Sequence, residues 1–247
     1  MSNAKPLLIL QLRPEDDTSD SEYNCILKYG CIPAQSTYRI RIEKTGIPTD
    51  LDLEHFSAII VGGSPFDIST PQEQKSATQN KIEGDFRSLL TKVVARDFPF
   101  LGACSGNGLL GSYLGASIST HYGEPVGCVT VDLTHAGRHD PLLVGFPTEI
   151  DVLLGHKEAC DNTPDGATLL IQGRDCPVQM FRVGQNVYAT QFHPEADPEE
   201  FNVRIEAYKH YGYFAAGEAE QLINRLSGCK TPYSQEILRR FVARYCA

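Results

Sequence analysis

The sequence predicts an α/β domain whose mainly parallel central sheet is flanked by helices, with an added antiparallel strand region and C-terminal helices. Three observations support this prediction. Apolar, strand-like runs alternate with helical periodicity over residues 1–120. Strand-like runs then dominate residues 121–192, and helical periodicity fills the remainder. Alternating strands and helices are typical of a parallel sheet, whereas consecutive strands favour antiparallel pairing.

The predicted strands are short apolar runs rich in branched side chains, bounded by glycine, proline or polar residues. Their length suits strands that are buried within a sheet. They are Leu7–Leu12, Ala58–Val61, Pro99–Gly102, Val126–Leu133, Val152–Leu154, Leu169–Ile171, Val178–Phe181 and Val187–Phe192.

Helical periodicity occupies several gaps between these runs and the end of the chain. One helix is predicted to end before Pro99, and a shorter one is closed by Gly30. Asp197 offers an N-cap for another helix, with Pro198 at its first position and acidic residues in its first turn. The apolar faces of these helices and of two C-terminal ones consist of Ile82, Phe86, Leu89, Leu90 and Val93; Tyr23, Ile26 and Leu27; Phe201, Ile205 and Tyr208; Leu222, Ile223 and Leu226; and Ile237, Leu238, Phe241, Val242 and Tyr245.

Length and composition favour one domain. The chain has 247 residues, of which 41% are hydrophobic and 21% charged, so it can bury a full core and is not disordered. No linker rich in proline, glycine or serine separates two parts of it. We expect a single domain over residues 1–247, with a core at about 5–216 and a C-terminal helical extension at about 217–247.

Charge and patterning exclude several classes of ligand. The net charge of −9 repels phosphate backbones, so we expect no nucleic acid partner. The longest run without Asp, Glu, Lys or Arg is Phe98–Gly123, but six glycines and four serines interrupt it. We therefore expect no membrane association. No Walker loop is present, and we expect no cofactor.

The cysteines and the N-terminus indicate an intracellular protein. Eight cysteines lie at irregular spacings without a Cys-x-x-Cys pair, and the apolar run after Lys5 is too short for a signal peptide. Thiols of such a chain are expected to stay reduced, so we expect a cytoplasmic protein without disulfides or structural zinc. No metal site is predicted, because Gly137 separates His135 from His139 and spoils the helix that a metal-binding pair would need.

Cys104 lies in the most informative stretch of the chain. An apolar strand ends at Gly102, and a helical face begins after Cys104, with glycines two residues before and after the cysteine. This pattern resembles the nucleophile elbow Gly-x-Ser-x-Gly, with sulfur in place of oxygen. A helix N-terminus favours thiolate, so we expect a lowered pKa for this thiol, with the N–H of Ser105 as an oxyanion donor. A small core residue at a packed strand end is the alternative reading.

A base for this cysteine is offered by His193. It ends an apolar strand, and Glu195 stands two residues further on, so both side chains project to one side of an extended segment. The carboxylate can then orient the imidazole, which completes a set of nucleophile, base and orienting group. A hydrogen-bonded histidine at a strand end is the alternative for His193 taken alone.

These two motifs together resemble the class I, or triad, glutamine amidotransferase domains, a family that includes the amidotransferase domain of GMP synthetase. The motifs are Gly-x-Cys-x-Gly around Cys104 and Gln-Phe-His-Pro-Glu at residues 191–195. The resemblance spans roughly residues 7–195 and implies a flavodoxin-like fold. Further landmarks follow in the order of the family: Ile59–Pro65, Gly123–Gly127, Gly155–Glu158 and Gln179–Arg182.

The resemblance implies that Cys104 attacks the side-chain amide of glutamine, releases ammonia and forms a thioester that water hydrolyses. His193 would transfer the protons, and Glu195 would orient it. The turn after the second predicted strand would supply a second oxyanion donor, from Gly63, beside Ser105. An ordinary strand-ending turn is the alternative reading for these glycines.

Two substrate-binding residues are expected from the same resemblance. His156 matches a landmark of the family and would form a wall of the pocket, although a surface or supporting position is the alternative. The family usually has glutamine four residues after the nucleophile, where this chain has Gly108. We therefore expect Gly108 to alter substrate choice.

The first functional hypothesis is a glutamine amidotransferase that hydrolyses glutamine and supplies ammonia to an acceptor synthase subunit. The second is a triad cysteine hydrolase of γ-glutamyl peptides or related amides, which Gly108 keeps open. The third is a catalytically silent regulatory module, against which the intact set of Cys104, His193 and Glu195 argues.

Overall fold

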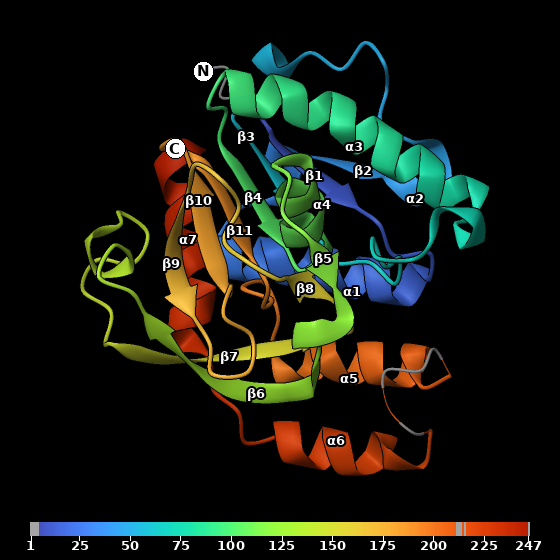
Figure 1. Cartoon of the computed structure of the whole chain (residues 1–247), viewed down its shortest axis with the longest axis vertical. Coiled ribbons are helices and arrows are strands. Elements are labelled where there is room, and N and C mark those ends of the chain that lie inside the picture. Colours follow the sequence, from blue (N-terminus) through green and yellow to red (C-terminus); the bar gives the residue numbers. More distant parts are fainter. Residues whose placement is uncertain (1–4, 211–213, 215, 247) are drawn as a thin grey trace.

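The computed structural model describes residues 5–210, 214 and 216–246, and its centre is a nine-stranded mixed sheet (Figure 1). The strand order is β2-β1-β3-β4-β11-β10-β9-β6-β7, and a separate pair joins β5 to β8. The predicted α/β architecture is thereby confirmed. The strands are β1 Leu7–Gln11, β2 Thr37–Arg41, β3 Ala58–Val61, β4 Phe100–Ala103, β5 Ile118–Ser119, β6 Glu124–Leu133, β7 Glu149–His156, β8 Ala159–Cys160, β9 Ala167–Gln172, β10 Met180–Val183 and β11 Val187–Thr190.

Strand direction divides the sheet into two halves. The strands β2, β1, β3, β4 and β11 are parallel neighbours. From β11 onward each pairing is antiparallel, through β10, β9, β6 and β7. The carboxyl ends of the parallel strands meet at one edge, which is where ligands bind in open α/β sheets.

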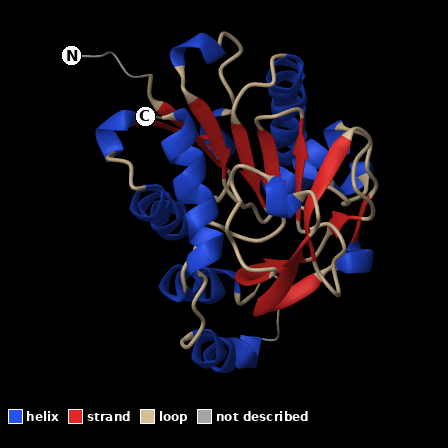
Figure 2. Ribbon diagram, turned by 90° about the vertical axis from the view of Figure 1, so that its left-hand side faces the viewer, coloured by secondary structure: helices blue, strands red, loops and turns tan. Residues whose placement is uncertain are grey.

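Helices cover both faces of the sheet (Figure 2). One core cluster joins the sheet to α1 and α7, and a second joins its other face to α3 and α4. A third, smaller cluster packs α5 and α6 together beside β7, at the lower end of the view in Figure 1. None of the helices in the described residues is long and apolar enough to span a bilayer. The helices are α1 Asp16–Gly30, α2 Ile42–Thr45, α3 Ala77–Ala95, α4 Ser105–Tyr113, α5 Pro198–Tyr208, α6 Ala219–Leu226 and α7 Pro232–Tyr245.

The helices follow their predicted signals closely. The Asp197 side chain accepts a hydrogen bond from the N–H of Glu200 and caps α5, as its sequence predicts. The left-handed residue that ends α1 is Cys31, one position after the expected Gly30. The last helix packs into the main core, where Ile237 and Leu238 are fully buried.

The two-residue strands β5 and β8 were not predicted, and one strand of the main sheet was also missed because its sequence lacks a buried apolar run. β2 is the edge strand of the parallel half, and only Ile40 among its five residues is buried. Its arginines face partners on α1: Arg41 contacts Asp16, and Arg39 contacts Asp20. A strand at the edge of a sheet is less buried than a central strand, so it carries fewer apolar residues and its sequence pattern is weaker.

The expectation of a chain without disulfides is wrong. Cys128 on β6 and Cys229, just after α6, form a disulfide, with their Cα atoms 6.3 Å apart. The two residues are 101 positions apart in the sequence. Local spacing therefore gave no signal of the pairing, which arises because α6 packs against β6.

Candidate active site

The candidate site lies where the carboxyl ends of four parallel strands meet. Arg13 follows β1, Gly62 and Gly63 follow β3, Cys104 follows β4, and His193 follows β11. Residues far apart in the sequence are thus brought to one edge because β1, β3, β4 and β11 are neighbours in the sheet.

Cys104 occupies a strained turn between β4 and α4. Its φ of 50° and ψ of −95° are rare for a residue with a side chain. The flanking glycines are needed for this turn, since a Cβ atom on Gly102 would lie 2.8 Å from the backbone of Gly106. A Cβ atom on Gly106 would lie 3.3 Å from Val61. The backbone has the features expected of a nucleophile elbow.

His193 is held by a buried carboxylate. Its Nδ1 lies 2.7 Å from Oε1 of Glu195, and both side chains are almost fully buried. The same carboxylate oxygen accepts a hydrogen bond of 2.9 Å from Nη2 of Arg204, on α5. Glu195 therefore accepts from His193 and from Arg204, which fixes the imidazole with Nε2 free to act as a base.

Burial determines the charge states of these groups. It lowers the pKa of His193 to about 4, assisted by Arg204 and opposed by Glu195. For Glu195, burial alone would raise the pKa, but His193 and Arg204 hold it well below its usual value. At neutral pH the pair is a neutral imidazole beside an ionised carboxylate, as a general base requires.

The expected low pKa of Cys104 is wrong. Burial raises the pKa of its thiol to about 12, although Arg13 and Arg204 act in the opposite direction. Desolvation of the charged form outweighs the neighbouring cations and the helix terminus. The thiol is therefore protonated at rest, so nucleophilic attack by this sulfur would require a base.

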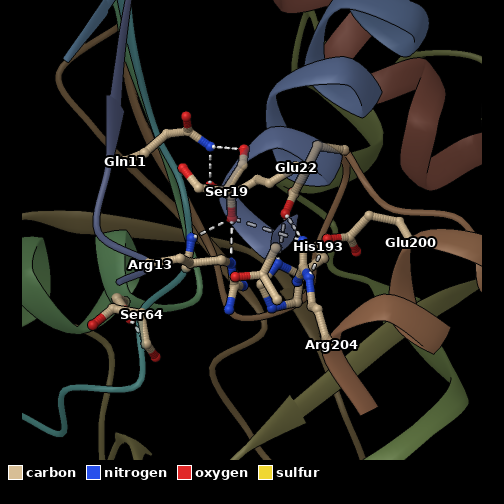
Figure 3. Close-up of polar contacts among 12 residues, drawn as sticks. Gln11, Arg13, Ser19, Glu22, Ser64, His193, Glu200 and Arg204 are labelled. Atoms are coloured by element: carbon tan, nitrogen blue, oxygen red, sulfur yellow. Dashed lines mark hydrogen bonds and ion pairs between the residues drawn. The ribbon is translucent and has the colours of Figure 1, made fainter. Parts of the chain in front are cut away.

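A buried ionic network beside His193 and Glu195 was missed in the sequence (Figure 3). Glu22, on α1, is fully buried and accepts hydrogen bonds from Nε of Arg13, at 2.8 Å, and from Nε2 of Gln11, at 2.8 Å. Nη2 of Arg204 lies 3.7 Å from the same carboxylate. Glu22 thereby links α1, the end of β1 and α5.

Glu200 completes this network on α5. It lies one turn before Arg204 and accepts a hydrogen bond from Nε of that arginine. Burial raises the pKa of Glu200 to about 7, while Arg204 and Arg13 lower it. Arg204 is thus held between Glu200 and Glu195, so the position of the Glu195 carboxylate depends on α5.

The two glycines after β3 make room for this network. A Cβ atom on Gly62 would lie 2.2 Å from the Glu22 carboxylate. A Cβ atom on Gly63 would lie 2.4 Å from Arg13 and 2.8 Å from His193. The N–H of Gly63 donates to Oε1 of Glu22 at 3.1 Å, so a role as oxyanion donor requires this hydrogen bond to break.

Two cavities meet at Cys104. The first encloses about 430 Å³, counted to its open mouth, and includes His193 and residues of α5. The second encloses about 350 Å³ and includes Ser105, Gly108, His156 and Glu158. Ser64, Cys104 and Gly155 line both cavities. The nucleophile therefore faces space on two sides.

The missing side chain of Gly108 does not leave an open space. A Cβ atom at this position would lie 3.0 Å from Cδ1 of Ile68 and 3.8 Å from Glu158. Glu158 in turn accepts hydrogen bonds from the N–H groups of Ile68, at 2.6 Å, and Ser69, at 2.7 Å. The loop that carries Ile68 is therefore held against Gly108 by Glu158.

His156 is buried beside the second cavity. Its Nε2 lies 3.0 Å from Glu124, and its Nδ1 lies 3.0 Å from the backbone oxygen of Glu158. Together with Cys176, these side chains place three possible ligand atoms within 4.8 Å of one another. The Glu124 carboxylate is already hydrogen-bonded to two side chains: to His156 and to Nε2 of Gln179, which lies 2.6 Å away.

Solved structures similar to this one include glutamine amidotransferases. A glutamine amidotransferase from Thermotoga maritima superposes with a TM-score of 0.76, covering 97% of this chain and 98% of that one at 20% identity. A putative GMP synthase subunit from Thermoplasma acidophilum gives a TM-score of 0.62, with 96% and 93% coverage at 21% identity. These likenesses concern the fold.

Sequence relatives agree with them. YfeJ of Salmonella typhimurium, a glutamine amidotransferase-like protein, is 29% identical over 142 residues, which span 58% of this chain and 58% of YfeJ. The match therefore covers little more than half of that relative. The glutamine-hydrolysing GMP synthase subunit of Thermoplasma acidophilum is 26% identical over 159 residues, or 63% of this chain and 72% of that protein.

A family profile covers most of the chain. The profile described as glutamine amidotransferase class-I matches residues 23–209, a range that includes Cys104, His193 and Glu195. The matched range extends from α1 to the residue after α5. The chain therefore belongs to the class I glutamine amidotransferase family.

Proposed function

We propose that the chain hydrolyses the side-chain amide of glutamine through a thioester on Cys104 and supplies the ammonia to an acceptor enzyme. The observation that carries this proposal is the strained turn of Cys104 beside a cavity that also contains His193, whose Nδ1 is held 2.7 Å from Glu195. Membership of the family adds the substrate class.

The proposed reaction uses these residues in two steps. His193 takes the thiol proton as sulfur attacks the amide carbon, and then gives it to the departing ammonia. Water next attacks the thioester, with His193 as base again, and releases glutamate. The N–H of Ser105, at the start of α4, would stabilise the oxyanion. Gly63 would join it only after releasing Glu22.

The second cavity is suited to the glutamyl group. Its wall includes Lys157 and Asp67, which lie 3.7 Å apart and carry opposite charges. An α-carboxylate and an α-ammonium group are adjacent on free glutamine, so such a pair can bind both. His156 would act by holding the backbone of Glu158, next to these residues.

The rate of Cys104 alkylation should depend steeply on pH. Since only thiolate reacts and the pKa of Cys104 is about 12, modification by iodoacetamide should accelerate about tenfold per pH unit between pH 7 and 9. Peptide mapping by mass spectrometry measures the rate at this site, with the exposed Cys31 as an internal reference for the reagent. A rate independent of pH over this range would indicate a thiolate–imidazolium pair instead.

Gly108 and Ile68 should act as a pair in substrate choice. Gly108→Gln alone should lower kcat/KM for glutamine, because its side chain collides with Ile68. Combining it with Ile68→Ala should lower the KM for glutamine below that of the wild type, whose KM we expect to be high. The cycle of single and double variants should give a coupling energy of about 0.5–3 kcal/mol. If the effects of the two substitutions on kcat/KM were additive, Ile68 and residue 108 would not share one part of the substrate pocket.

A partner protein is proposed on the basis of the relatives. The GMP synthase relatives from two archaea are separate subunits by name, and the chain resembles them over much of their length. An amidase that worked alone would waste glutamine, so the isolated chain should be slow and a partner should accelerate it by about 5–150-fold. Ammonia release should be measured before and after adding the acceptor protein co-purified from the native host. An equal rate in both assays would contradict this coupling.

A further inference from the structure

The first cavity opens on the His193 side of Cys104. Counted to its open mouth it encloses about 430 Å³, and residues of β6 and α5 line it together with His193. In the proposed reaction the leaving amine departs toward His193, which must protonate it. The space is therefore on the side where a larger leaving group would lie.

Most of the wall of this cavity is apolar. Val126 from β6, Phe201 and Ile205 from α5, and Phe214 contribute hydrocarbon surface. Phe201 and Ile205 are buried in the cluster that joins α5 to α6, so this wall is a fixed part of the fold. Such a surface suits an aliphatic or aromatic side chain on the leaving amine.

A cationic group is placed in the same wall. Arg204 lines the cavity, and its side chain is only 7% exposed. Its Nε donates to Glu200 and its Nη2 to Glu195, but Nη1 is buried without a hydrogen-bond partner in the described part of the chain. A buried N–H that lacks a partner is costly, and a carboxylate is the acceptor that suits a guanidinium group best.

We propose that the preferred substrates are γ-glutamyl amides of α-amino acids with apolar side chains, whose leaving residue occupies the first cavity. The glutamyl group would lie in the second cavity, the apolar side chain against Ile205 and Phe214, and the free carboxylate toward Arg204. This inference rests on the thioester chemistry of the proposed function and replaces ammonia by a larger amine.

Hydrolysis of such an amide follows the same two steps as the hydrolysis of glutamine. Sulfur bonds to the γ-carbonyl carbon, the C–N bond breaks, and the thiol proton passes through His193 to the nitrogen of the departing amino acid. Water then adds to the thioester, gives a proton through His193 to the sulfur, and releases glutamate. The net reaction is a γ-glutamyl amide plus water giving glutamate and an amino acid, with no other reactant.

The test compares substrates on the full chain without a partner. Glutamate release should be followed for glutamine, γ-glutamyl-leucine, γ-glutamyl-isopentylamine and α-glutamyl-leucine. We expect kcat/KM for γ-glutamyl-leucine to exceed that for glutamine by at least about tenfold, as for a pocket filled by several extra carbons. The isopentylamide, which lacks the carboxylate, should be poorer than γ-glutamyl-leucine, and the α-linked peptide should not be cleaved.

A preference for glutamine would overturn the inference and leave the amidase proposal intact. Cleavage of none of the four compounds by folded protein would also overturn it, and the partner assay would then decide the amidase proposal separately. If kcat/KM for the isopentylamide equalled that for γ-glutamyl-leucine, the proposal that Arg204 recognises the carboxylate would be overturned.

Variants at Val126 test the location of the leaving group. This half-buried residue lines only the first of the two cavities. Val126→Phe should reduce the ratio of kcat/KM for γ-glutamyl-leucine to that for glutamine by about tenfold, because it fills the cavity. Val126→Ala should shift preference toward γ-glutamyl-phenylalanine. Unfolding temperatures of both variants verify folding, and unchanged ratios in both would exclude this cavity as the binding place.

Discussion

Replacing Cys104 with alanine should lower the rate of amide hydrolysis by about 10⁴-fold or more, since loss of the nucleophile removes the covalent path. The strained turn directs this one side chain into the space between the two cavities. No other thiol in the described residues lines either cavity. Ammonia or glutamate release under saturating substrate gives the rate, and mass spectrometry of the denatured protein detects the acyl-enzyme.

The matched control is Cys31→Ala, which removes an exposed thiol at the end of α1. This variant should keep the wild-type rate. Retention of activity by Cys104→Ala would refute the covalent mechanism, whatever the control shows.

His193→Ala should cost a similar factor of about 10⁴, whereas Glu195→Gln should lose roughly 100-fold less. His193 is the group assigned to move the thiol proton, and without it the thiol, with a pKa of about 12, stays protonated. A glutamine at position 195 can still accept hydrogen bonds from His193 and Arg204 through its amide oxygen. It therefore preserves much of the orientation while losing the charge.

Single-turnover acylation rates test this order directly, because they exclude later steps. Thermal unfolding of each variant serves as the control, since Glu195 also bonds to Arg204 in the buried network. A greater loss in Glu195→Gln than in His193→Ala, with both proteins folded, would contradict the assigned roles.

Local patterns were sufficient to predict which residues meet at the centre of the candidate site. The glycines around Cys104 predict a tight turn, and the structure contains a turn so tight that no Cβ would fit at Gly102. His193 and Glu195 stand two residues apart on an extended segment, so their 2.7 Å contact follows from strand geometry. The sheet order then brings β4 and β11 together as parallel neighbours.

Features that depend on distant packing were not predictable in this way. Arg13 follows β1, Glu22 is on α1, and Glu200 and Arg204 are both on α5, so three separate segments form the network. Charged residues in a sequence are ordinarily assigned to the surface. The direction of the Cys104 pKa was predicted wrongly because its burial depends on the surrounding side chains.

The effect of Gly108 on substrate preference also depends on distant packing. Replacement of the usual glutamine by Gly108 is visible in the sequence, but its consequence depends on Ile68, which lies 40 residues earlier and fills the space. Whether a missing side chain leaves a hole or admits a neighbour is decided by the loop that Glu158 anchors.

The left-handed backbone of Cys104 has a consequence for the evolution of this chain. A residue with a side chain in such a conformation costs about 1–3 kcal/mol of folding stability, which glycine would largely avoid. Selection for stability alone would thus favour loss of the cysteine. A lineage that stopped needing a side chain here would be expected to drift toward glycine at this position.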